Sequence, residues 1–102
     1  MNVIDHQPHA WYLLEDNGVL FIDAACSHSF VDYSVLIELD KQELQNFESD
    51  GRSFLDQLAY DIHYSAPGVR GSNSPYKSRN LAQLRAEEVS EAVKIWQAAR
   101  IG

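Results

Sequence analysis

The sequence predicts an α+β fold: a three-stranded antiparallel meander over 9–16, 19–26 and 30–39, followed by two long helices over 41–63 and 80–100. Three observations support this: an Asn-Gly pair between two apolar runs, a clean apolar–polar alternation, and two segments with helical spacing. Both helices are expected to pack on one face of the sheet. With 102 residues the chain is expected to form one domain.

The first hairpin is predicted by Asn-Gly at 17–18, between the runs HAWYLLED and VLFIDAAC. Both residues tolerate the positive φ that a type I′ turn requires. A two-residue loop pairs Asp16 with Val19 and places His9 opposite Cys26. Residues 1–8 are expected to be a short arm.

The third strand, 30–39, follows from alternation. Its apolar side carries Val31, Tyr33, Val35, Ile37 and Leu39, and its polar side carries Asp32, Ser34 and Glu38. Period two is typical of a strand with two different faces. Short connections between the strands favour a meander.

The helix over 41–63 is predicted to begin at Asp40, because Glu43 three residues later completes a capping box. Its apolar stripe continues in phase through Gly51, which favours one unbroken helix. The alternative is a break at 49–51, since glycine costs a helix about 1 kcal/mol relative to alanine.

The last helix is predicted to be capped by Asn80 after a loop rich in Gly, Ser and Pro. Its apolar spacing comes from Ala82, Ala86, Val89, Val93 and Trp96. The basic side chains Arg70, Lys77 and Arg79 flank the loop just before the helix start. Because free N–H groups and arginines bind anions, these three residues and Asn80 are a candidate anion or phosphate site. The alternative is that the arginines pair with the acidic first half of the chain.

Charge is divided unevenly along the chain. Residues 1–50 hold ten acidic residues against Lys41 alone, whereas 51–102 hold five acidic residues against seven basic ones. This acidic balance argues against nucleic acid, whose phosphates require clustered Lys and Arg. It is compatible with a basic protein partner.

The face of the sheet without helices is expected to be open and apolar. It would carry Tyr12, Leu14, Phe21 and Leu36, together with Phe30. Exposed apolar area of this kind marks a partner surface, and we expect a homodimer or protein partner there. The alternatives are that the faces of one strand are swapped, or that the sheet curls over its own side chains.

The single cysteine, Cys26, excludes an internal disulfide framework and fits a reducing compartment. No signal peptide or membrane span is recognisable, so we expect a soluble cytoplasmic protein. His6, His9, Cys26 and His28 are a candidate zinc set, but ordinary surface histidines near a half-buried cysteine are the simpler interpretation, and no metal or cofactor is expected. Cys26 opposite His9 is likewise either a thiolate–imidazole pair or a small apolar strand residue.

These observations favour a small acidic non-enzymatic interaction module, self-associating or bound to a basic protein. Immunity and antitoxin-type inhibitors of basic enzymes include many small acidic α+β proteins, an analogy of size and charge alone. The first alternative is a binder of a small anion at the 70–80 loop. The second is a thiol- or metal-dependent enzyme around Cys26.

Overall fold

The structure, a computed structural model, describes residues 1–28 and 31–101. A four-stranded antiparallel sheet in the order β1-β2-β3-β4 precedes the helices. The elements are β1 (Asn2–Gln7), β2 (Trp11–Asp16), β3 (Val19–His28), β4 (Val31–Glu38), α1 (Lys41–Asp50), α2 (Arg52–Ser65), the short 3₁₀ helix η1 (Lys77–Arg79) and α3 (Ala86–Ile101). The predicted α+β class and antiparallel meander are confirmed, but the sheet has four strands instead of the predicted three. Phe30, the expected first residue of the third strand, lies outside the described residues.

The hairpin between β2 and β3 has the predicted turn and register. Asp16 pairs with Val19, and Trp11 pairs with Ala24. The two loop residues at 17–18 both have positive φ, 52° and 84°. This is the backbone conformation that a type I′ turn needs.

The expected N-terminal arm is instead an edge strand, β1, paired with β2. A bulge interrupts the pairing between Val3 and Asp5. Arg52 of α2 holds the end of β1, because its guanidinium bonds to Asp5 at 2.6 Å and to the carbonyl oxygen of His6 at 3.2 Å. Bulges and covered carbonyl groups are common protections of sheet edges.

The predicted single helix over 41–63 is wrong, and the alternative break is correct. The predicted capping box is present, with Asp40 accepting from the Glu43 N–H and Glu43 accepting from the Asp40 N–H. Gly51 ends α1 with φ 63° and ψ −137°, and α2 begins at Arg52. The left-handed φ turns the chain sharply, as glycine allows without a Cβ clash.

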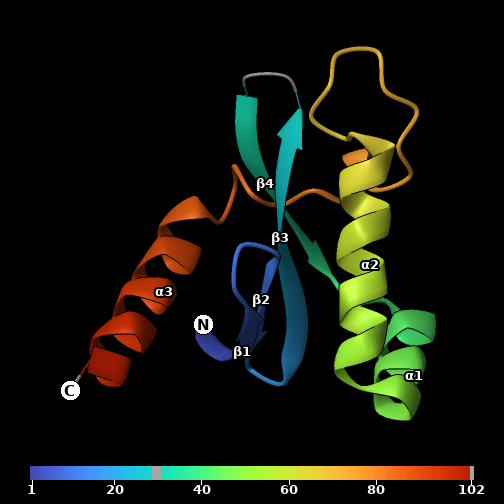
Figure 1. Cartoon of the computed structure of the whole chain (residues 1–102). Helices are drawn as coiled ribbons and strands as arrows, with labels where there is room; N and C mark the ends of the chain where they lie inside the picture. The colour runs from blue at the N-terminus through green and yellow to red at the C-terminus, as the bar shows by residue number, and fades with distance from the viewer. Residues whose placement is uncertain (29–30, 102) are drawn as a thin grey trace.

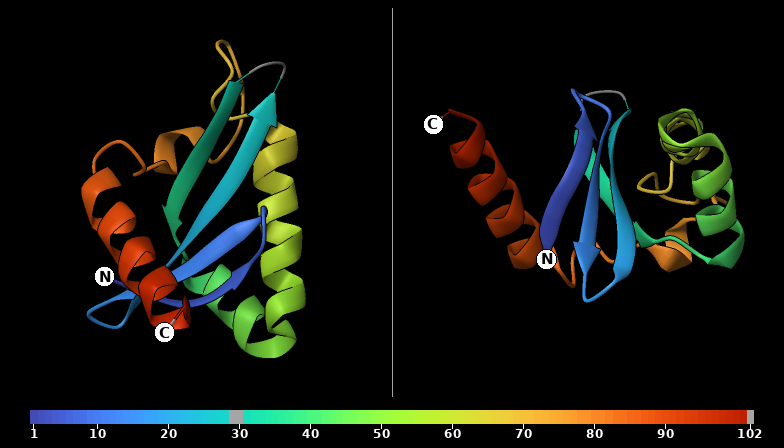
Figure 2. Two further views of the ribbon diagram at one scale, coloured as in Figure 1. Left: turned by 60° about the vertical axis from the view of Figure 1, so that its left-hand side comes forward. Right: turned by 90° about the horizontal axis from the view of Figure 1, so that it is seen from below.

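The prediction that both long helices lie on one face is also wrong. Figures 1 and 2 show the sheet as a middle layer, with α1 and α2 on one side and α3 on the other. The last helix begins at Ala86 instead of residue 80, because residues 80 and 81 bond to the sheet and residues 82–85 form turns. Leu81 N–H donates to the Leu36 carbonyl oxygen at 2.7 Å, and Leu36 N–H donates to Asn80 Oδ1 at 3.1 Å. These bonds extend the β4 edge and lead the chain to the opposite face.

A hydrophobic core therefore lies on each face of the sheet. The core beneath α2 contains Trp11, Leu13, Ile22, Ala24, Cys26, Val35, Ile37, Leu39, Leu55, Leu58, Ala59 and Ile62. The smaller core beneath α3 contains Leu14, Phe21, Leu36 and Ala92, with Tyr12 and Val89 packed against it. The sheet face that was expected to be open is thus covered within the chain. Of the four predicted interface residues, Leu14, Phe21 and Leu36 are fully buried, and Tyr12 is half-buried.

The described helices include none that is both long and apolar enough to cross a membrane.

Candidate functional site

A cavity of about 620 Å³ lies between α2, the turn after β1, the end of β3 and the start of β4. We call it the α2 pocket. Its lining residues are His9, Ala10, Ala25, Cys26, Ser27, Asp32, Tyr33, Asp56, Ala59, Tyr60 and His63. Apolar walls with a few convergent polar groups are typical of binding sites.

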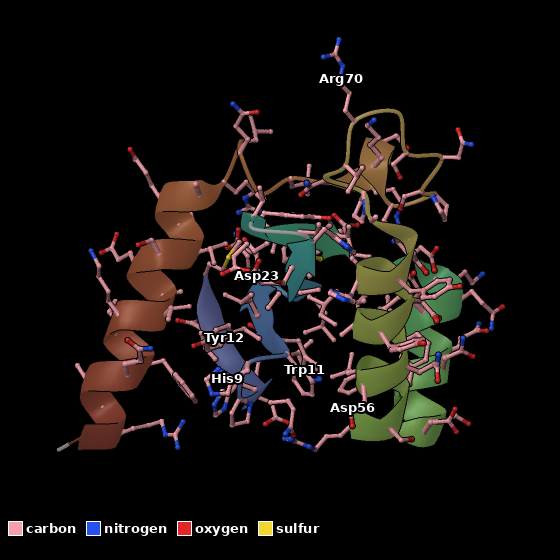
Figure 3. The ribbon with its side chains drawn as sticks, turned by 45° about the horizontal axis from the view of Figure 1, so that its top comes forward. His9, Trp11, Tyr12, Asp23, Asp56 and Arg70 are labelled. Carbon is pink, nitrogen blue, oxygen red and sulfur yellow. The ribbon has the colours of Figure 1, made fainter. Side chains whose placement is uncertain are left out.

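The carboxylate of Asp56 is held in place by the core. Trp11 is buried, and its indole Nε1–H donates to Asp56 Oδ1 at 2.8 Å. Figure 3 shows Trp11 on the side of the sheet that faces α2, and Asp56 on that helix. Arg52 stacks on the Trp11 ring at 5.2 Å from its centroid. Within the described ranges, the second oxygen of Asp56 accepts no hydrogen bond, so it is available to a ligand.

His63 also lines the pocket, and its imidazole stacks on that of His28, which is not a lining residue. The rings of His28 and His63 lie 4.7 Å apart with an interplanar angle of 19°. Ser27 N–H donates to His63 Nδ1 at 3.4 Å. Nε2 of His28 is buried and has no hydrogen-bond partner among the described residues.

Cys26 lies in the pocket wall as a protonated thiol. Burial raises its pKa from 9.0 to about 11, the Asp23 carboxylate adds to the rise, and a hydrogen bond with Tyr33 opposes it. Its sulfur contacts the Ala24 carbonyl oxygen at 3.9 Å. A thiol with a raised pKa is a weak nucleophile. The predicted pairing of His9 with Cys26 is wrong, because β2 begins at Trp11 and His9 lies in the preceding turn with φ 64°. Both residues nevertheless line the α2 pocket.

The proposed zinc set is divided between the two faces of the sheet. His6 packs on the α3 side, 4.4 Å from the Trp96 ring and 5.6 Å from the Tyr12 ring, whereas His9 and Cys26 line the α2 pocket. Across residues 1–28 and 31–101, no group of three or more His, Cys, Asp or Glu side chains is placed to hold a metal ion.

Two exposed tyrosines extend the pocket along the outer surface of α2. Tyr60 and Tyr64 are 59% and 77% exposed, and their rings stack at 6.0 Å with an interplanar angle of 18°. Sequence reasoning missed these residues and Asp56. Their spacing of four on the polar side of the predicted helix was the available signal, because residues four apart share a helix face.

The predicted anion site is not assembled as one cluster. Arg70 projects into solvent from the loop after α2 (Figure 3), and Lys77 lies in η1. Arg79 bonds to Glu43, and Asn80 bonds to β4. Arg79 therefore pairs with an acidic residue of the first half of the chain, as the alternative interpretation predicted. Anion binding at this loop stays a prediction.

The carboxyl group of Asp23 lies beneath α3, on the face of the sheet opposite the α2 pocket. Asp23 and Ser34 line a smaller cavity of about 220 Å³ with Leu36 and residues of α3 and the segment before it. Burial raises the pKa of Asp23 from 3.8 to about 6, and a hydrogen bond with Ser34 opposes the rise. This carboxyl group therefore titrates near neutrality.

No protein-family model, curated protein or solved structure matches the chain.

Proposed function

We propose that this chain is a non-enzymatic protein-binding module that holds a positively charged partner at the α2 pocket and the adjoining Tyr60–Tyr64 pair. One observation carries the proposal. Asp32 and Asp56 line the pocket beside the rings of Tyr33 and Tyr60, and its lining in the described chain includes no Lys or Arg. Carboxylates and aromatic faces together attract a cationic side chain.

The overall charge supports a basic partner. The chain carries a formal net charge of −7. Arg52, Arg79 and Arg85 are each engaged by an acidic side chain of the chain itself. Complementary charge accelerates encounter and selects partners.

The exposed tyrosines support a protein surface. Tyrosine is enriched at interfaces and at the residues that contribute most to binding. The stacked pair of Tyr60 and Tyr64 lies outside both cores, so folding does not explain its position. Beside a pocket, two such rings provide apolar contact area at low cost in side-chain entropy.

The two alternatives receive less support. A thiol-dependent enzyme needs an activated cysteine, and burial instead keeps Cys26 protonated. A binder of anions at the 70–80 loop would use both arginines, but Arg79 bonds to Glu43 and only Arg70 projects into solvent.

The test is titration of the isotope-labelled chain with a short peptide of mixed Lys and Arg, using a Glu peptide as the negative control. We expect amide shifts on α2 and at the ends of β3 and β4. Tyr60→Ala with Tyr64→Ala should weaken binding by about fivefold or more, which corresponds to about 1 kcal/mol. Leu84→Ala with Ile95→Ala, which removes two exposed apolar side chains from the other side of the molecule, is the matched control. Shifts spread evenly over all acidic surfaces, or an equal loss in the control, would refute the proposal.

A further inference from the structure

On the basis of that proposed function, we infer that the α2 pocket receives an arginine side chain of the partner. The guanidinium lies against the Tyr60 ring and bonds to Asp56, and its methylene stem lies along the alanine-lined wall. The inference rests on three features of the pocket: an oriented carboxylate, an exposed ring and a neutral wall.

The oriented carboxylate comes first. The Trp11 indole fixes one oxygen of Asp56 at 2.8 Å from Nε1. A carboxylate that is held in this way has already lost its rotational freedom, so a ligand does not have to order it. Its other oxygen accepts from an incoming donor, and an arginine fork supplies several donors in one plane.

The exposed ring is the second feature. Tyr60 lines the pocket, and its exposed ring stacks with Tyr64 at 6.0 Å. A guanidinium stacks on such a ring more readily than an ammonium, because it is planar and weakly hydrated. The chain packs its own arginines in this manner, with Arg100 at 4.4 Å from the Trp96 ring and Arg85 at 4.9 Å from the Phe21 ring.

The neutral wall is the third feature. Ala10, Ala25 and Ala59 line the pocket beside the thiol of Cys26. Small apolar groups suit a methylene stem, which buries along apolar surface while its charged end stays polar. Asp32 lines the same cavity from β4 and adds a second negative charge. The lining therefore offers carboxylates and small apolar side chains, the two kinds of surface that an arginine side chain contacts.

The experiment compares three peptides that differ in one side chain: acetyl-Gly-Arg-Gly-amide, the citrulline peptide, which has the same shape without charge, and the lysine peptide. Binding to the full chain is followed by the Trp11 indole N–H resonance and the Tyr60 and His63 amides. We expect the arginine peptide to bind most tightly and citrulline to bind about tenfold or more weakly, because the charge-assisted bonds are lost. Lysine should bind between the two.

The decisive variant is Asp56→Asn, which keeps an acceptor for Trp11 but removes the charge. It should reduce the preference for arginine over citrulline to a small remainder, because Asp32 is then the remaining carboxylate of the lining. Asp61→Asn is the matched control, because Asp61 lies on the same helix, bonds to Gln57 and does not line the pocket. If Asp56→Asn does not fold, Tyr60→Leu provides the second variant and should reduce the preference for arginine over lysine.

Each outcome decides the inference. Equal binding of arginine and citrulline, or an equal loss in Asp61→Asn, would overturn it. If the mixed basic peptide still binds at α2 in a Tyr60- and Tyr64-dependent manner, the proposed function stands and only the arginine inference fails. If neither the mixed peptide nor the arginine peptide binds, both fail.

Discussion

The guanidinium of Arg79 lies 2.6 Å from Oε1 of Glu43, joining the segment after the 66–76 loop to the start of α1. The same guanidinium donates to the Glu38 carbonyl oxygen at 2.8 Å, at the end of β4. Glu43 also accepts the Asp40 N–H of the capping box. One carboxylate therefore serves both the helix start and the connection toward α3.

This relationship predicts that Arg79→Ala destabilises the chain. We expect the free energy of unfolding to fall by about 1–2 kcal/mol, because Glu43 is mostly buried and loses a charged partner. Arg70→Ala, at the solvent-exposed loop, should change it by less than about 0.5 kcal/mol. Urea denaturation of both variants checks this. Equal effects of the two substitutions would contradict a clamp role for Arg79 and return it to the anion-site hypothesis.

Substitution of Phe21 tests whether α3 covers this face of the sheet. Phe21 is 3% exposed and lies in the core beneath α3, with Arg85 over its ring. Phe21→Asp should unfold the chain or lower its stability by about 3 kcal/mol or more, since it places a charge in an apolar core. Val19→Asp, on the same strand but exposed, should leave the fold intact. Circular dichroism and sedimentation distinguish the outcomes. A folded Phe21→Asp monomer that has lost a wild-type dimer would instead indicate that this sheet face is open in the monomer.

The carboxyl group of Asp23 predicts a pH dependence of stability. Its pKa is raised from 3.8 to about 6, so the folded chain binds this proton more tightly than the unfolded chain. The corresponding stabilisation is complete below pH 3.8, is lost as pH rises through about 6, and does not change further above that range. Asp23→Asn should remove this decline and be more stable than wild type at neutral pH. Urea denaturation across this range, with the exposed Asp61→Asn as control, isolates the effect. An unchanged pH profile in Asp23→Asn would contradict the assignment.

Cys26 should react slowly with iodoacetamide at neutral pH. Its pKa of about 11 leaves little thiolate, and its side chain is buried. The rate should rise as the pH approaches this pKa, and the chain unfolded in urea should react much faster. Mass spectrometry at timed intervals measures both rates. Rapid alkylation of the folded chain at neutral pH would revive the thiol-enzyme alternative.

Local sequence determined those parts of the structure in which the interacting residues are close together in the chain. The Asn-Gly turn at 17–18 set the β2–β3 register, including the pairing of Trp11 with Ala24. The same register does not extend to His9, which lies in the turn before β2 and lines the α2 pocket together with Cys26. Asp40 and Glu43 set the start of α1 through a capping box that spans one helical turn. Such interactions need little loop closure, so local propensity decides them.

Tertiary structure alone decided the features that depend on residues far apart in the chain. The sequence predicted Asn80 as a helix cap. In the structure Asn80 Oδ1 accepts a hydrogen bond from the Leu36 N–H of the edge strand β4, and this bond directs the chain toward the opposite face, where α3 lies. Trp11 looked like an ordinary core residue, and only the docking of α2 brought Asp56 to its indole N–H from 45 residues away. A hydrophobic stripe shows that a helix buries one side, but not which face of the sheet covers it. Which face a helix covers depends on the hydrogen bonds to the sheet edge and the ion pairs that the whole chain can form at the same time. The resulting placement of α2 and α3 determined where the sheet is covered and where the α2 pocket stays open.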